Sequence, residues 1–228
     1  MAKRELSLAV ILRELEKLYG KPKKPIPKSP LDWILWENVA YLVDDDRRER
    51  AFYALATNVG LTAEKIAKAS SRVLYEVTQL GGMHPEDRVD RLKGIAELAI
   101  EHGGGDLSQV LELEPSAARK VLKKFPSIGD PGAEKILMFC GASRALALES
   151  NGLRVLTRLG FGEEKKSYSA TYKSAQDAIA SGLKTDAGWL ARAHQLLRMH
   201  GQALCKRTSP DCDACALTAH CRFFARLG

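Results

Sequence analysis

The sequence predicts an all-α protein. Almost every periodic segment repeats its apolar residues at intervals of three and four, which is the spacing of a helix face, and no strand-like alternation persists. The 228 residues are 45% hydrophobic and 28% charged, as expected for a globular chain with one or two cores. A Pro- and Lys-rich stretch at residues 21–30 and the glycine at position 141 predict boundaries near residues 28 and 142.

Helices in the first half follow from these intervals. The first is predicted from four residues on one face: Leu8, Leu12, Leu15 and Tyr19. The second is expected to carry three residues on one face: Trp33, Glu37 and Tyr41. A third helix begins near Arg47, and Thr62 has the chemistry of an N-cap for a helix that runs towards Leu80.

The second half continues the helical pattern. One helix ends at His102, immediately before three consecutive glycines. Ser116 starts a short helix, and Asp130 is expected to cap the next one. A helical segment near residues 153–159, a polar loop, and a helix from about 186 to 200 complete the prediction.

The charge and the N-terminus limit the possible functions. A net charge of +7 and an isoelectric point near 9.2 favour a polyanionic partner such as nucleic acid, although a solvated basic surface has the same composition. The apolar run at residues 6–12 is followed at once by charged side chains, so it predicts neither a signal peptide nor a membrane span. We expect a cytoplasmic protein associated with the nucleoid, or a nuclear one in a eukaryote.

Four of the five cysteines lie close together near the C-terminus: Cys205, Cys212, Cys215 and Cys221. Four thiolates can bind a structural zinc ion or an iron–sulfur cluster. Zinc sites usually contain two close cysteine pairs, whereas the gaps here are six, two and five residues. A single loop around a bulkier [4Fe–4S] cluster fits this spacing better, and Cys140 is left as a small core residue.

A second motif occupies residues 121–136, where two short amphipathic helices flank the tight loop at residues 125–129. Such a loop presents backbone N–H groups, and the following helix N-terminus favours a phosphate. The loop resembles the helix-hairpin-helix motif, with Ser127 in the place of the usual first glycine. Together with the six, two, five cysteine spacing, it resembles the endonuclease III and adenine DNA glycosylase families.

This resemblance implies an all-α fold of two domains. Residues 29–141 would form a helical barrel with the hairpin, and residues 1–28 with 142–228 would form the cluster domain with the loop at 205–221. The implied partner is double-stranded DNA with a damaged or mismatched base, which a monomer flips into a pocket between the domains. The DNA-binding positions would be Pro126, Ser127, Ile128, Gly129, Gly132 and Tyr41.

The resemblance also assigns the catalytic positions. Pro131 stands where family members that cleave the strand have a nucleophilic lysine, and Lys135 lies one turn further along. Glu149 takes the place of the family aspartate that stabilises the developing cation. Glu37 matches the glutamate of adenine glycosylases that protonates the departing purine.

The expected function is therefore that of a DNA glycosylase that hydrolyses the base–sugar bond without efficient lyase activity. Two alternatives stay open. One is a catalytically impaired relative that binds DNA or lesions, and the other is a zinc-bearing structural protein.

Overall fold

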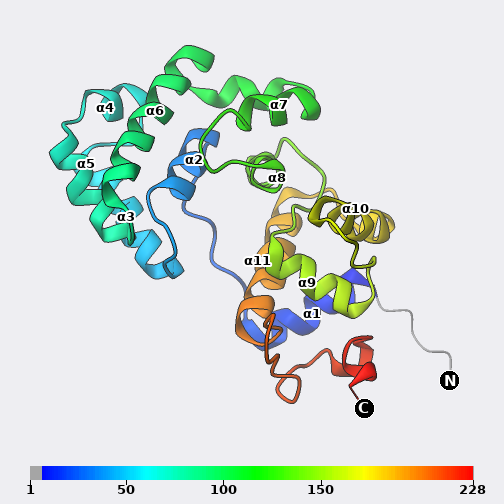
Figure 1. The fold of residues 1–228 in the computed structure, drawn as a ribbon. Helices are drawn as coiled ribbons and strands as arrows, with labels where there is room; N and C mark the ends of the chain where they lie inside the picture. Colours follow the sequence, from blue (N-terminus) through cyan, green and yellow to red (C-terminus); the bar gives the residue numbers. More distant parts are fainter. Residues whose placement is uncertain (1–6, 228) are drawn as a thin grey trace. The chain divides into compact units, whose positions relative to one another are not determined.

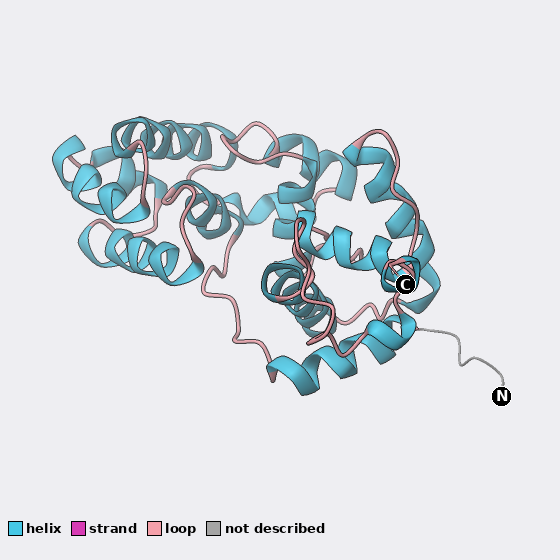
Figure 2. Cartoon of the chain, turned by 60° about the horizontal axis from the view of Figure 1, so that its bottom comes forward, coloured by secondary structure: helices cyan, strands magenta, loops and turns pink. Residues whose placement is uncertain are grey.

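The computed structural model describes residues 7–227, and the all-α prediction is confirmed. Helices and short 3-10 turns are joined by loops (Figure 2), and the described part of the chain contains no strand beyond an isolated bridge between Tyr41 and Gly82. The chain divides into two compact units, Pro25–Ser143 and Met1–Lys24 with Arg144–Gly228. No helix among the described residues is both long and apolar enough to cross a membrane.

The unit Pro25–Ser143 contains seven α-helices: α2 (Pro30–Asn38), α3 (Asp45–Asn58), α4 (Ala63–Lys68), α5 (Ser71–Thr78), α6 (Pro85–Gly103), α7 (Pro115–Leu122) and α8 (Asp130–Phe139). They enclose one apolar core, and α6 packs against α2, α4 and α5 (Figure 1). Phe52, Leu55 and Ile95 are fully buried in this core.

Local chemistry explains where these helices begin. Ser29 and Asp32 form a reciprocal capping box at the start of α2, and Pro30 occupies its first turn. Asp44 caps α3 by accepting a hydrogen bond from the Arg47 N–H at 2.7 Å. The acidic run at 44–46 therefore serves the N-terminus of α3, where negative charge complements the helix dipole.

Three predictions within the unit Pro25–Ser143 need correction. The helix expected from Thr62 to Leu80 breaks into α4 and α5, because Ser70 caps a new helix immediately after α4 ends. Tyr41 lies beyond the end of α2 and does not share a helix face with Glu37. Asp130 is the first residue of α8 and not its N-cap, since its carboxylate pairs with Lys123 at 2.7 Å.

The other unit contains α1 (Leu8–Tyr19), α9 (Ser150–Leu159), α10 (Tyr168–Ile179) and α11 (Ala187–Ala203), followed by the cysteine loop. α11 packs against both α1 and α9 (Figure 1). The polar loop predicted before α11 was wrong, because it contains α10. Ser167 caps this helix, but only Thr171, Ala175 and Ile179 are buried, so its apolar pattern is weak.

Candidate functional site

The loop between α7 and α8 is exposed at two of its predicted DNA-binding positions, Ser127 and Gly129. Ser127 has a φ of 63°, the left-handed conformation in which glycine is usual, and its hydroxyl accepts a hydrogen bond from Arg91 at 3.3 Å. Ile128 is buried and fixes the loop to the core. Gly129 provides no side-chain cap, so side chains at the N-cap do not occupy the first N–H groups of α8.

Asn38 connects this loop to α2 through its side chain. Its amide nitrogen donates to the Pro126 carbonyl at 2.9 Å and to the Ile34 carbonyl at 2.8 Å, and the residue is buried. A buried carbonyl that loses its donor keeps the cost of desolvation. The link between α2 and the hairpin loop therefore depends on one side chain that the sequence did not single out.

We expect Asn38→Ala to lower the free energy of unfolding by about 1–3 kcal/mol, because the Pro126 carbonyl loses its buried donor. Urea titration followed by circular dichroism measures this change. Asn58→Ala is the matched control, since Asn58 is the last residue of α3 as Asn38 is of α2, but is exposed. Equal destabilisation by the two variants would contradict the anchoring role.

Glu37 and Lys135 lie together within the unit Pro25–Ser143. They form an ion pair, and the Lys135 ammonium also lies 5.4 Å from the centre of the Trp33 ring. The side chains of Lys135 and Glu37 are only 19% and 25% exposed. Lys135 is thus largely removed from solvent. The Trp33 ring that faces the Lys135 ammonium is itself stacked on Phe139.

Glu149 is the N-cap of α9. One carboxylate oxygen accepts from the Gly152 N–H at 2.6 Å, and the other accepts from the Asn151 amide at 2.8 Å. Arg154 donates to the Asn151 oxygen at 2.7 Å and to the carbonyls of Gly201 and Cys205, each at 2.8 Å. These bonds fix the Glu149 carboxylate at a helix N-terminus, where negative charge is stabilised.

The extended segment before Glu149 is held by residues that the sequence did not reveal. Gln176 donates to the Leu146 carbonyl at 2.6 Å, and the Leu148 N–H donates to the Tyr172 hydroxyl at 3.3 Å. His194 lies 2.7 Å from the Ala147 carbonyl. Both α10 residues were inside the predicted polar loop, so their helical spacing was the signal that could have indicated them.

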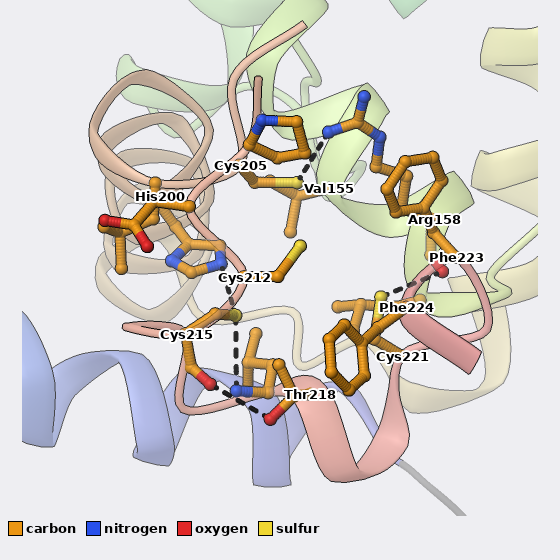
Figure 3. Close-up of a pocket in the computed structure, with 15 residues that line it drawn as sticks. Val155, Arg158, His200, Cys205, Cys212, Cys215, Thr218, Cys221, Phe223 and Phe224 are labelled. Carbon is orange, nitrogen blue, oxygen red and sulfur yellow. Dashed lines mark hydrogen bonds between the residues drawn. The ribbon is translucent and has the colours of Figure 1, made fainter. Parts of the chain in front are cut away.

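The four C-terminal cysteines line one pocket, and their sulfur atoms face a common space (Figure 3). Apolar side chains complete the walls: Val155, Leu159, Leu204, Leu217, Phe223 and Phe224. Among residues 7–227, no three histidine, cysteine or acidic side chains are arranged to bind one metal ion. What the pocket itself offers is four thiols around a shared apolar space.

Four thiolate anions this close together would repel one another. Burial raises the pKa of Cys215, the N–H of Leu217 partly offsets the rise, and the neighbouring cysteines add to it. Burial and the nearby cysteines likewise raise the pKa of Cys212. A positively charged group among them would remove this repulsion, as iron or zinc does for its thiolate ligands.

Two loops of the unit Pro25–Ser143 form an exposed apolar tip, which consists of Tyr41, Leu42 and Met83. These side chains are 49%, 73% and 55% exposed. The Tyr41 N–H donates to the Gly81 carbonyl at 2.8 Å, and a Cβ at Gly81 would lie 2.1 Å from the Val39 carbonyl oxygen. The tip therefore depends on a close backbone contact that only glycine allows.

The chain is similar to known proteins in sequence and in fold. No family model matches the chain. It is 27% identical over 176 residues to endonuclease III of Sulfolobus acidocaldarius, covering 76% of this chain and 73% of the relative. It is 25% identical over 218 residues to endonuclease III of Thermotoga maritima, covering 96% and 93%. A trapped endonuclease III–DNA covalent intermediate has the same fold, with a TM-score of 0.73, 17% identity, and 97% and 99% coverage. In both sequence and fold, the chain is therefore similar to the helix-hairpin-helix DNA glycosylases.

Proposed function

We propose that this chain is a base-excision DNA glycosylase that hydrolyses the bond between deoxyribose and a damaged or mismatched base flipped out of duplex DNA. The observation that carries the proposal is Glu149, a carboxylate fixed by the Gly152 N–H and the Asn151 amide. A fixed anion stabilises the positive charge that the sugar develops as the bond breaks, and it orients the attacking water.

The ion pair of Glu37 and Lys135 is proposed to contact the flipped base. It offers one acceptor and one donor on side chains that are mostly removed from solvent. The Lys135 ammonium donates a hydrogen bond to the Glu37 carboxylate, so protonation of a departing base would involve both side chains. Hydrogen bonds of this kind to a flipped base are how such enzymes select it.

Duplex binding is proposed to use the hairpin loop and the apolar tip. The loop at 125–129 would bind a phosphate through backbone N–H groups, next to Gly132 in the first turn of α8. At the tip, Tyr41 would stack on a base or fill the space that a flipped base leaves. The net charge of +7 supports a polyanionic partner.

The cysteine loop is proposed to hold a [4Fe–4S] cluster, bound by Cys205, Cys212, Cys215 and Cys221. Four thiols around one apolar cavity fit a group whose irons each bind one thiolate. Such a group supplies a rigid cross-link and electron-transfer chemistry. The cluster takes no part in the proposed release of the base.

A panel of duplexes tests the activity. Each duplex carries one damaged or mismatched base, and the purified protein with its iron is incubated with each, with and without later alkali treatment. We expect base release from at least one lesion, seen as strand cleavage after alkali. Binding to lesion duplexes without release from any would instead favour the impaired, DNA-binding relative, an alternative that Pro131 and Glu149 motivate.

The same protein is expected to lack efficient lyase activity. Pro131 has no amine, and the Lys135 ammonium is engaged by Glu37, while a Schiff base requires a free amine. Borohydride should therefore trap no covalent complex with an abasic duplex, whereas a glycosylase with a lysine nucleophile gives one in parallel. A trapped adduct that disappears in Lys135→Ala would identify Lys135 as a nucleophile.

A further inference from the structure

Arg158, in the last turn of α9, contacts the start of the cysteine loop with its side chain. One guanidinium nitrogen donates to the Lys206 carbonyl at 2.7 Å and to the Cys205 sulfur at 3.3 Å. The other donates to the Arg207 carbonyl at 3.2 Å. The bond to sulfur is charge-assisted, because the guanidinium that donates it carries a full charge.

Arg158 also contacts the end of the loop. Its backbone carbonyl accepts from the Phe223 N–H at 3.0 Å, and its guanidinium carbon lies 4.3 Å from the centre of the Phe223 ring. Figure 3 shows Arg158 beside both Cys205 and Phe223. One residue therefore joins the two ends of the cysteine loop to α9.

His200 approaches a second sulfur from α11. Its Nε2 lies 3.4 Å from the Cys215 sulfur, and its Nδ1 lies 3.0 Å from the Tyr19 hydroxyl. A ligand thiolate has only lone pairs to offer, so the proton has to reside on Nε2. The Tyr19 hydroxyl then donates to Nδ1, which fixes this tautomer.

We propose that Arg158 and His200 raise the reduction potential of the cluster by donating hydrogen bonds to two of its four ligand sulfurs, Cys205 and Cys215. The inference rests on the proposed [4Fe–4S] group. Cluster potentials depend on net charge, on hydrogen bonds to sulfur and on solvent exposure. A donor next to a thiolate stabilises the state with the extra electron, and the charge of Arg158 adds to this effect.

Arg158→Gln tests this inference, because glutamine removes the charge and keeps an amide donor. Iron and acid-labile sulfide are measured first, and the potential of the loaded protein is then found by redox titration followed by visible absorption. We expect the ratio of reduced to oxidised cluster at a fixed applied potential to fall about tenfold, which equals ~59 mV for one electron. Tyr19→Phe, which no longer fixes the His200 tautomer, should shift the potential less and in the same direction.

Arg207→Gln is the matched control, since it removes the same charge from an exposed side chain of the same loop. Arg158→Lys keeps the charge and should restore most of the potential; it also replaces Arg158→Gln in the titration if the glutamine variant loses its iron. If Arg158 only holds the two ends of the cysteine loop together, its substitution would change how fast iron is lost but not the reduction potential of the retained cluster. An unchanged potential in Arg158→Gln, or an equal shift in Arg207→Gln, overturns the inference and leaves the proposed cofactor standing. Absence of iron in the wild-type protein overturns both.

Discussion

Glu149→Gln is expected to lower the rate of base release by about 10²- to 10³-fold, because it removes the fixed negative charge that is proposed to stabilise the developing cation. The amide oxygen can still accept from the Gly152 N–H, so the cap of α9 and the fold should be retained. Single-turnover release from the best lesion of the panel measures the effect. Binding to the same duplex should change little.

Two further variants sharpen this test. Glu149→Asp shortens the side chain to that of the family residue, and we expect it to retain far more activity than Glu149→Gln because it keeps the charge at a good N-cap. Glu164→Gln removes an exposed acid from the same unit and controls for net charge. Unchanged release by Glu149→Gln would remove Glu149 from the chemistry.

The second large effect is expected when a proposed cluster ligand is removed. Cys215→Ala is expected to abolish iron binding and to destabilise the unit by about 2–5 kcal/mol, as the loss of a covalent cross-link does. The loop has little structure of its own. Apart from Leu217, none of its described side chains is buried, and its only helical elements are short 3-10 turns. Iron and sulfide content, visible absorption and thermal unfolding measure these changes.

Cys140→Ala is the control for this variant. Cys140 lies in the other unit, is partly buried against its core, and has its pKa raised to about 12 by burial. We expect the full iron content to remain after this substitution. A wild-type protein that contains zinc in place of iron, or a Cys215→Ala variant that keeps its iron, would contradict the assignment of the ligands.

Much of the fold was accessible from the sequence because its signals are local. The spacing of Leu8, Leu12 and Leu15 predicted α1, and all three are buried. The cysteine gaps predicted that one loop brings four thiols together, and the four cysteines line one pocket. The resemblance to helix-hairpin-helix glycosylases is confirmed by the relatives and by the fold.

What the sequence could not provide are contacts between residues far apart in the chain. The ion pair of Glu37 with Lys135 joins residues 98 positions apart, and no local pattern encodes it. The same holds for Asn38 beneath the hairpin. One-residue errors such as Asp130 arise because an acid can cap a helix or pair with a lysine, and only the packed structure decides between the two.

The apolar tip has a thermodynamic consequence. Arg88, which is 1% exposed, donates to the carbonyls of Thr78 and Gly82, and Arg47 donates to the Leu80 carbonyl at 2.8 Å. These hydrogen bonds hold the backbone that leads to Met83 in the absence of a partner. In the proposed contact with a duplex, the backbone of the tip would therefore lose little conformational entropy.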